Sequence, residues 1–100
     1  MSVALLPGSF DPMTLGHLDI VKRAVSLYGE AVVAVMNNEN KTYTHTLEQR
    51  LKMAELTTAG LPCVRVIADT GMVIDLFDRV GADVIVKGVR NETDRAYEEE

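Results

Sequence analysis

Cysteine, long apolar runs and excess positive charge are what this 100-residue sequence has least of. Its one cysteine, Cys63, cannot form an internal disulfide, which fits a reducing compartment. No apolar run approaches the roughly 20 residues of a membrane-spanning helix, and Pro7 and Gly8 interrupt the N-terminal stretch too early for a signal peptide. The formal net charge of −5 gives nucleic acids and anionic membranes no general attraction. We therefore expect a soluble, cytoplasmic protein that binds neither nucleic acid nor membranes.

The composition is that of a folded domain. Hydrophobic residues make up 47% of the sequence and charged residues 25%, which provides enough apolar surface for a core. The length corresponds to a single domain over residues 1–100. The sequence stops at residues 96–100 in a helical pattern, with no capping glycine and no following strand. We therefore expect the domain to be truncated at its C-terminus.

Four short apolar runs rich in β-branched residues predict buried strands. These runs are residues 3–6, 31–36, 63–68 and 84–86. None of them alternates cleanly with polar residues, as expected for parallel strands that are covered on both faces.

The segments between these runs have the residue patterns of helices. Apolar residues recur at helical spacing over residues 18–28, and Gly29 follows where a C-cap is common. Thr46 and Gln49 are spaced as a capping box for a second helix, and residues 73–80 carry a third apolar stripe that ends at a glycine. The alternation of strands and helices predicts an α/β fold with a doubly wound parallel sheet.

Three loops of the predicted fold carry residues suited to binding phosphate. They follow the first, second and fourth strands, at residues 7–17, 37–41 and 87–90. Because ligands of such sheets bind beyond the carboxyl ends of the strands, we expect these loops to share one edge. Three of the ten Lys and Arg residues and one of the two histidines would then gather there, despite the acidic total. This pattern favours a phosphate-containing ligand.

The first of these loops has the local features of an anion site. Gly8 and Ser9 follow a strand directly, where backbone N–H groups can cradle a phosphate. Gly16 and His17 open a helix, whose unsatisfied N–H groups and dipole favour an anion. The alternative is that the glycines only shape a turn and that His17 faces water. Taken alone, the glycines or His17 would support the anion site and this alternative about equally.

The sequence of this loop resembles a known signature. Pro-Gly-Ser-Phe-Asp-Pro at residues 7–12, followed by Thr14-x-Gly16-His17, is similar to the nucleotidylyltransferase motif in the version found in phosphopantetheine adenylyltransferases. The resemblance implies a Rossmann-like nucleotidylyltransferase fold. It continues in the family's order and spacing through Lys41, residues 46–50 and 87–90, Asp94, Tyr97 and Glu98.

The resemblance implies an enzyme that transfers AMP from ATP to 4′-phosphopantetheine, giving dephospho-coenzyme A and pyrophosphate. It implies that His17 stabilises the transition state, and that the protein is a homo-oligomer, since the family commonly forms homohexamers. The positions that match ATP contacts are Ser9, Phe10, His17, Gly88, Val89, Arg90 and Glu98. The positions that match contacts to the acceptor are Ser9, Lys41, Val73 and Lys87.

The chemistry of this transfer suits the residues present. An ionised phosphate is already a nucleophile, so catalysis consists of positioning and charge stabilisation. His17, Lys41 and Arg90 are suitable donors for the charge that grows on the phosphate oxygens. Mg²⁺ would share that work, held largely by the nucleotide phosphates and by water, so we assign no protein ligand to the metal.

Two other functions stay open from the sequence. The same chemistry could use another acceptor, as in a cytidylyltransferase or a nicotinamide mononucleotide adenylyltransferase, although the start of the motif and the pair Lys41 and Lys87 favour the pantetheine acceptor. The chain could instead be a non-catalytic nucleotide-binding or assembly module. The family continues beyond this length with a strand, a Ser/Thr-rich loop that contacts ATP and further helices. We therefore expect poor turnover from the 100-residue chain alone.

Several other reactive side chains are expected to have no role in the chemistry. We expect Cys63 to be a small core residue, because it falls within a strand pattern. We expect His45 to be a solvated loop histidine without partners. Asp75 and Asp78 should lie on the exposed face of the third helix.

Overall fold

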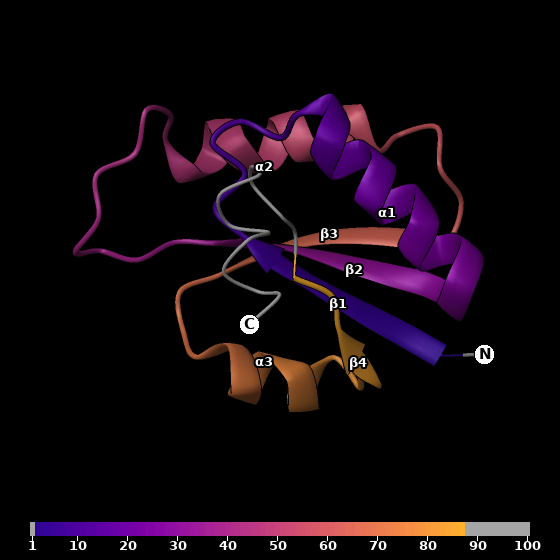
Figure 1. The fold of residues 1–100 in the computed structure, drawn as a ribbon. Helices are drawn as coiled ribbons and strands as arrows, with labels where there is room; N and C mark the ends of the chain where they lie inside the picture. The colour runs from indigo at the N-terminus through magenta and orange to yellow at the C-terminus, as the bar shows by residue number, and fades with distance from the viewer. Residues whose placement is uncertain (1, 88–100) are drawn as a thin grey trace, which may run out of the picture.

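The structure is a parallel sheet whose strands alternate with helices. The computed structural model describes residues 2–87. Its elements are, in chain order, β1 (Ser2–Gly8), α1 (Leu15–Tyr28), β2 (Gly29–Met36), α2 (Leu47–Thr57), β3 (Val64–Asp69), α3 (Val73–Arg79) and β4 (Val84–Ile85). The strands pair in the order β3-β2-β1-β4, and every pair is parallel (Figure 1). The predicted α/β fold with a parallel sheet is confirmed.

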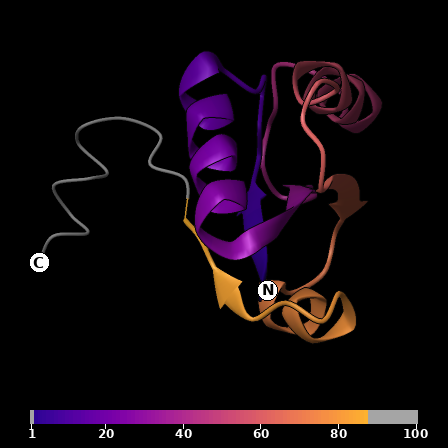
Figure 2. The same cartoon turned by 90° about the vertical axis from the view of Figure 1, so that its right-hand side faces the viewer.

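The helices cover both faces of the sheet, which makes it doubly wound. α1 and α2 lie on one face and α3 lies on the other (Figure 2). The buried side chains of the two central strands alternate between these faces. Leu6 and Val33 join the core under α1 and α2, whereas Leu5 and Val32 pack with Leu76 of α3. Because both faces are buried, these strands lack polar alternation in the sequence.

The end of α1 and the start of α2 have the capping residues that the sequence predicts. At the start of α2, Thr46 Oγ1 accepts the Gln49 N–H at 3.1 Å, and the Gln49 side chain accepts the Thr46 N–H at 3.0 Å. α1 ends at Tyr28 and is followed by the C-cap Gly29, whose φ of 104° is accessible to glycine without strain. The predicted capping box and the predicted C-cap are both confirmed.

Cys63 lies outside the strand to which the sequence assigns it. It is exposed and has a φ of 63°, and β3 begins one residue later at Val64. The prediction that Cys63 is a core residue is therefore wrong, because the chain is still turning into the sheet at this position. Its carbonyl nevertheless accepts the Ala31 N–H at 3.0 Å. The predicted exposure of Asp75 and Asp78 on α3 is confirmed.

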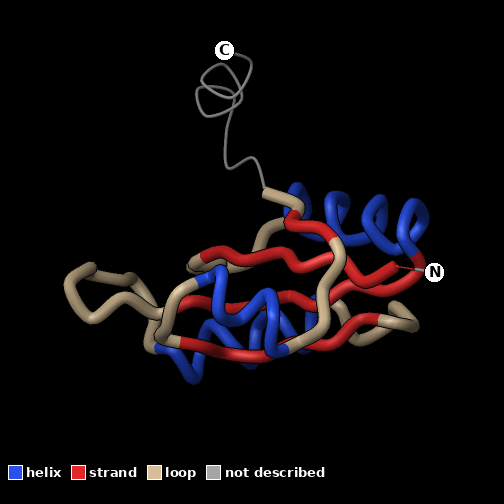
Figure 3. Tube along the Cα trace, turned by 90° about the horizontal axis from the view of Figure 1, so that it is seen from below, coloured by secondary structure: helices blue, strands red, loops and turns tan. Residues whose placement is uncertain are grey.

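The order of the strands reverses at β1, and this reversal marks a binding edge. β2 and β3 are added on one side of β1 and β4 on the other. The carboxyl ends of β1 and β4 therefore border the crevice in which doubly wound sheets bind ligands. The strands of Figure 1 point toward the left, and residues 37–46 extend beyond this edge in Figures 1 and 3.

Candidate active site

The turn after β1 folds a phenylalanine ring back over the end of its own strand. Phe10 is 7% exposed and has a φ of 47°, a left-handed conformation that is uncommon outside glycine. Its ring lies against Gly8, where an added Cβ would be 3.1 Å from two ring carbons. The close approach of this ring is therefore the reason for glycine at position 8. Ser9, between the two residues, is half-buried.

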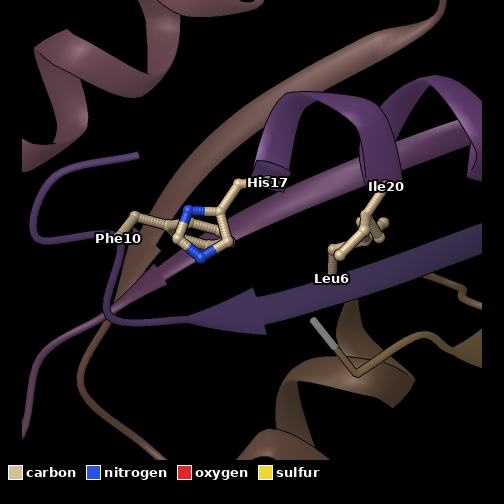
Figure 4. A pocket seen from close by; sticks show the side chains of 4 residues that line it. All are labelled: Leu6, Phe10, His17 and Ile20. Atoms are coloured by element: carbon tan, nitrogen blue, oxygen red, sulfur yellow. The ribbon is translucent and has the colours of Figure 1, made fainter. Parts of the chain in front are cut away.

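His17 is held at the start of α1 by Thr14 and by the Phe10 ring. Its Nδ1 accepts the Thr14 N–H at 3.0 Å, and its own N–H donates to Thr14 Oγ1 at 3.3 Å. The Phe10 and His17 rings meet edge to face, with centroids 5.1 Å apart and an interplanar angle of 82° (Figure 4). Because Nδ1 is the acceptor, a neutral ring carries its proton on Nε2 and can donate from that atom. His17 is therefore a fixed donor at the N-terminus of a 14-residue helix, where anions are favoured.

Two cavities adjoin these loops, and they differ in what they can hold. The smaller, about 10 Å³, is lined by Leu6, Phe10, His17 and Ile20 (Figure 4). It offers no more room than a single water needs, so it is a packing gap rather than a substrate site. The larger, about 620 Å³, lies between the loops after β2 and β3 and is lined by residues 36–40 and 70–73. That volume is typical of small-molecule sites.

The acceptor residues predicted from the sequence lie at this same edge. Val73, at the start of α3, lines the larger cavity. Lys41 directly follows the lining residues 36–40, and its Nζ lies 5.8 Å from the centre of the Tyr43 ring. Lys87 is exposed and follows β4. The two lysines therefore bring positive charge to the carboxyl edge, as predicted.

The side chain of Arg50 is fully buried, although arginine is a residue type that is mostly exposed. Nη1 donates to the Ser9 carbonyl at 3.1 Å and to the Met36 carbonyl at 3.0 Å, and Nε donates to the His45 carbonyl at 3.2 Å. Arg50 thus ties the turn after β1 to the end of β2. This role is not apparent from the sequence, whose only signal is that Arg50 lies in the segment 46–50 that matches the family motif.

The prediction that His45 has no partner is wrong. Its Nδ1 lies 2.8 Å from Oδ1 of Asp11, and its main-chain N–H donates to the same oxygen at 2.9 Å. The Thr44 N–H donates to the other carboxylate oxygen at 2.6 Å. Burial raises the pKa of Asp11, but the hydrogen bonds from His45 and Thr44 outweigh burial and hold that pKa below its ordinary value. The Asp11 carboxylate therefore fastens the turn after β1 to the segment that leads into α2.

Some predicted site residues lie beyond the part of the chain that the structure describes, and two kinds of feature are absent from residues 2–87. Gly88, Val89, Arg90 and Glu98, all predicted to contact ATP, lie outside the described residues. Within residues 2–87, no three His, Cys, Asp or Glu side chains gather in a way that could hold a metal ion. In the same range no helix has both the length and the apolar character needed to cross a membrane.

Comparison with known sequences finds one family model and several relatives that share a name. The sequence model of the cytidylyltransferase-like family matches residues 5–100. The protein named phosphopantetheine adenylyltransferase from Limosilactobacillus reuteri (strain DSM 20016) is 48% identical over 98 residues, covering 98% of this chain and 57% of that protein. The protein of the same name from Flavobacterium psychrophilum is 44% identical over 98 residues, covering 98% of this chain and 65% of that protein. The chain thus spans less than two thirds of the length of these relatives.

A solved structure shares the fold. The lipopolysaccharide core biosynthesis protein from Thermoplasma volcanium GSS1 matches with a TM-score of 0.71 and 24% identity, covering 97% of this chain and 82% of that one. At this identity the likeness concerns the fold alone. The family match, in contrast, spans nearly the whole sequence and includes the loops after β1, β2 and β3. The chain belongs to the cytidylyltransferase-like family.

Proposed function

We propose that the full-length protein transfers AMP from ATP to 4′-phosphopantetheine, giving dephospho-coenzyme A and pyrophosphate, a step of coenzyme A biosynthesis. The observation that carries the proposal is the convergence of three features on one sheet edge: the His17 donor at the start of α1, Lys41 and Lys87, and the 620 Å³ cavity. The names of the relatives, at 44–48% identity, support this acceptor over others.

The proposed reaction needs no covalent enzyme intermediate. A phosphate oxygen of the acceptor attacks the α-phosphorus of ATP in line, forming a new P–O bond while the bond to pyrophosphate breaks. Negative charge grows on the oxygens around the α-phosphorus and on the leaving group. The protein therefore contributes by aligning two anions and by donating to these oxygens.

We assign the nucleotide to the crevice beside β1. There the N-terminus of α1 favours phosphate, and His17 Nε2–H is the donor for a phosphoryl oxygen. Ser9 and Phe10 form the turn against which the nucleotide packs. This proposal also gives ATP contacts to four residues outside the described range, Gly88, Val89, Arg90 and Glu98.

We assign the acceptor to the larger cavity. Its volume suits an extended molecule the size of phosphopantetheine. Val73 contributes an apolar wall to this cavity. Lys41 and Lys87 supply positive charge for the acceptor phosphate, and their lysine ammonium groups act as point charges rather than bidentate forks.

We propose Mg²⁺ as the cofactor, bound together with ATP. We propose that the ion is held largely by phosphate oxygens and water, because Mg²⁺ usually keeps several waters and rarely has an all-protein site. When bound, the ion would neutralise part of the phosphate charge. A cytoplasmic location and a homo-oligomeric state, with a homohexamer as the family's common form, are part of the same proposal.

The experiment is pyrophosphate release by the full-length protein with Mg²⁺, using ATP or CTP together with 4′-phosphopantetheine or nicotinamide mononucleotide. We expect release only with ATP and 4′-phosphopantetheine. A preference for CTP, or turnover of nicotinamide mononucleotide, would replace the proposed acceptor or nucleotide. ATP binding without release from any pair would favour a non-catalytic nucleotide-binding module.

The acceptor site is tested by Lys41→Met. A charge-assisted hydrogen bond contributes about 1.5–3 kcal/mol, so the KM for 4′-phosphopantetheine should rise roughly 10- to 100-fold while the KM for ATP changes little. Lys52→Met is the matched control, because Lys52 is an exposed lysine on α2. An unchanged acceptor KM in Lys41→Met would remove Lys41 from the site.

A further inference from the structure

Arg50 makes four hydrogen bonds to groups in three separate segments. Its partners are the Ser9 carbonyl in the turn after β1, the Met36 carbonyl and the Asn37 side chain at the end of β2, and the His45 carbonyl before α2. The guanidinium is planar and rigid, so these partners are held at fixed positions relative to one another. One buried side chain thus sets the spacing between the turn after β1 and the loop after β2.

The charge of this arginine is not neutralised within the described part of the chain. Its four hydrogen-bond partners are carbonyl or amide oxygens, and none of the ion pairs within residues 2–87 includes it. Burying a cation without a carboxylate is costly unless its donors are satisfied. Here the guanidinium donates to three backbone carbonyls and to the Asn37 side chain, and its positive charge remains behind Ser9.

A second chain of contacts leads from Arg50 to the loop that carries Lys41. The Arg50 guanidinium stacks on the Tyr43 ring, 3.8 Å from its centre. The Tyr43 hydroxyl accepts the Asn38 N–H at 2.8 Å, and the Asn38 carbonyl accepts the Lys41 N–H at 3.0 Å. These contacts connect Arg50 to the main chain of Lys41 through two intermediate residues, Tyr43 and Asn38.

We infer that Arg50 is a positioning residue for adenylyl transfer. It holds the turn that carries Ser9 and the loop that carries Lys41 at the separation at which ATP and the acceptor phosphate can react. The inference rests on the proposed function for the identity of the two ligands. It does not make Arg50 a catalytic residue, because its side chain is fully buried and acts through the backbone.

The test compares Arg50→Lys with Arg65→Lys in the full-length protein. Lysine keeps the charge at position 50 but cannot make the four hydrogen bonds or the planar stack. Arg65 is a matched control, because it lies near the amino end of β3 and pairs with Glu30 at 3.4 Å, far from the ligand loops. The measurements are thermal unfolding, kcat and KM for both substrates, and amide hydrogen exchange over residues 9–14 and 37–43.

In Arg50→Lys, hydrogen exchange should rise in both loops while the core strands keep their protection. We expect kcat to fall about 10- to 100-fold, because small misplacements of reacting groups have effects of this size. Arg65→Lys should match the wild type in all measurements. A folded Arg50→Lys protein with wild-type kcat, or with unchanged exchange in the two loops, overturns the inference.

Two further experiments test the role of Arg50 if Arg50→Lys does not fold or if the proposed function is wrong. If Arg50→Lys does not fold, Tyr43→Phe breaks only the hydroxyl contact to Asn38. It should raise the acceptor KM several-fold, and an unchanged KM overturns the inference. If the wild type does not act on 4′-phosphopantetheine, the proposed function fails. The positioning role is then decided by the loop exchange of Arg50→Lys and by its affinity for ATP, and wild-type values of both overturn it.

Discussion

The substitution Gly8→Ala tests how tightly the turn after β1 is packed. A methyl group at position 8 would lie 3.1 Å from two carbons of the Phe10 ring. Ordinary contacts between carbons are 3.5–4.0 Å, so the ring must move by a few tenths of an ångström. Phe10 is 7% exposed and its ring also contacts His17, which leaves it little free space. The strain is steric, because φ at Gly8 is not in the left-handed region.

The expected cost of this overpacking is about 1–3 kcal/mol in the free energy of unfolding. A shift of the Phe10 ring also moves its edge-to-face partner His17, which is the proposed donor to ATP. We therefore expect Gly8→Ala to weaken ATP binding as well as stability, while the KM for the acceptor changes less.

Urea unfolding and calorimetric titration with ATP measure these two effects. The matched control is Gly60→Ala, since an added Cβ at Gly60 meets no atom within 4 Å and its φ is not left-handed. Gly60→Ala should keep wild-type stability and affinity. Wild-type stability and wild-type ATP affinity in Gly8→Ala would contradict the packing described for Phe10.

Two further predictions concern the segment that leads into α2. Thr46→Ala removes the N-cap of α2 and should lower the free energy of unfolding by about 1 kcal/mol in urea titrations. Thr42→Ala, in the exposed loop before α2, is the control and should leave that free energy unchanged. Equal effects of the two substitutions would contradict the capping box. The pKa of Asp11 is lower in the folded protein than its unfolded value of about 3.9, so its contribution to stability is present above that pH and is lost as pH falls through the lowered pKa. The difference in stability between wild type and Asp11→Asn, followed by unfolding at several pH values, should therefore shrink in acid. A constant difference would refute the stabilising hydrogen bonds that the Asp11 carboxylate accepts from His45 and Thr44.

The fold was predictable because its signals are local. The apolar runs of β1 and β2, the capping residue Thr46 and the C-cap Gly29 each act within a few residues of their own position. The strand order was not predicted, since it depends on packing between elements far apart in the sequence. Cys63 was misassigned because its apolar character continues the pattern of β3, whereas a positive φ places it in the preceding turn.

The sequence predicted the location of those candidate site residues that belong to a loop motif. It did not predict contacts between residues that are far apart in the sequence. The sequence placed His17 at a helix start and the two lysines at one edge, and the structure agrees. It did not reveal the contact between Asp11 and His45, which joins residues 34 positions apart. Nor did it reveal the burial of Arg50, because three of the four partners of its guanidinium are backbone carbonyls, and any residue type supplies those.

Identifying the product made by the wild type and by His17→Ala is the most direct test of the proposed function. Each full-length protein is incubated with ATP, Mg²⁺ and 4′-phosphopantetheine, and dephospho-coenzyme A is quantified by mass spectrometry. We predict that the wild type forms dephospho-coenzyme A in equal amount with pyrophosphate. We expect His17→Ala, with its fold checked by circular dichroism, to lose about 100-fold or more in rate, the effect of removing one transition-state donor. Absence of this product from the wild type, or its undiminished formation by His17→Ala, would contradict the account.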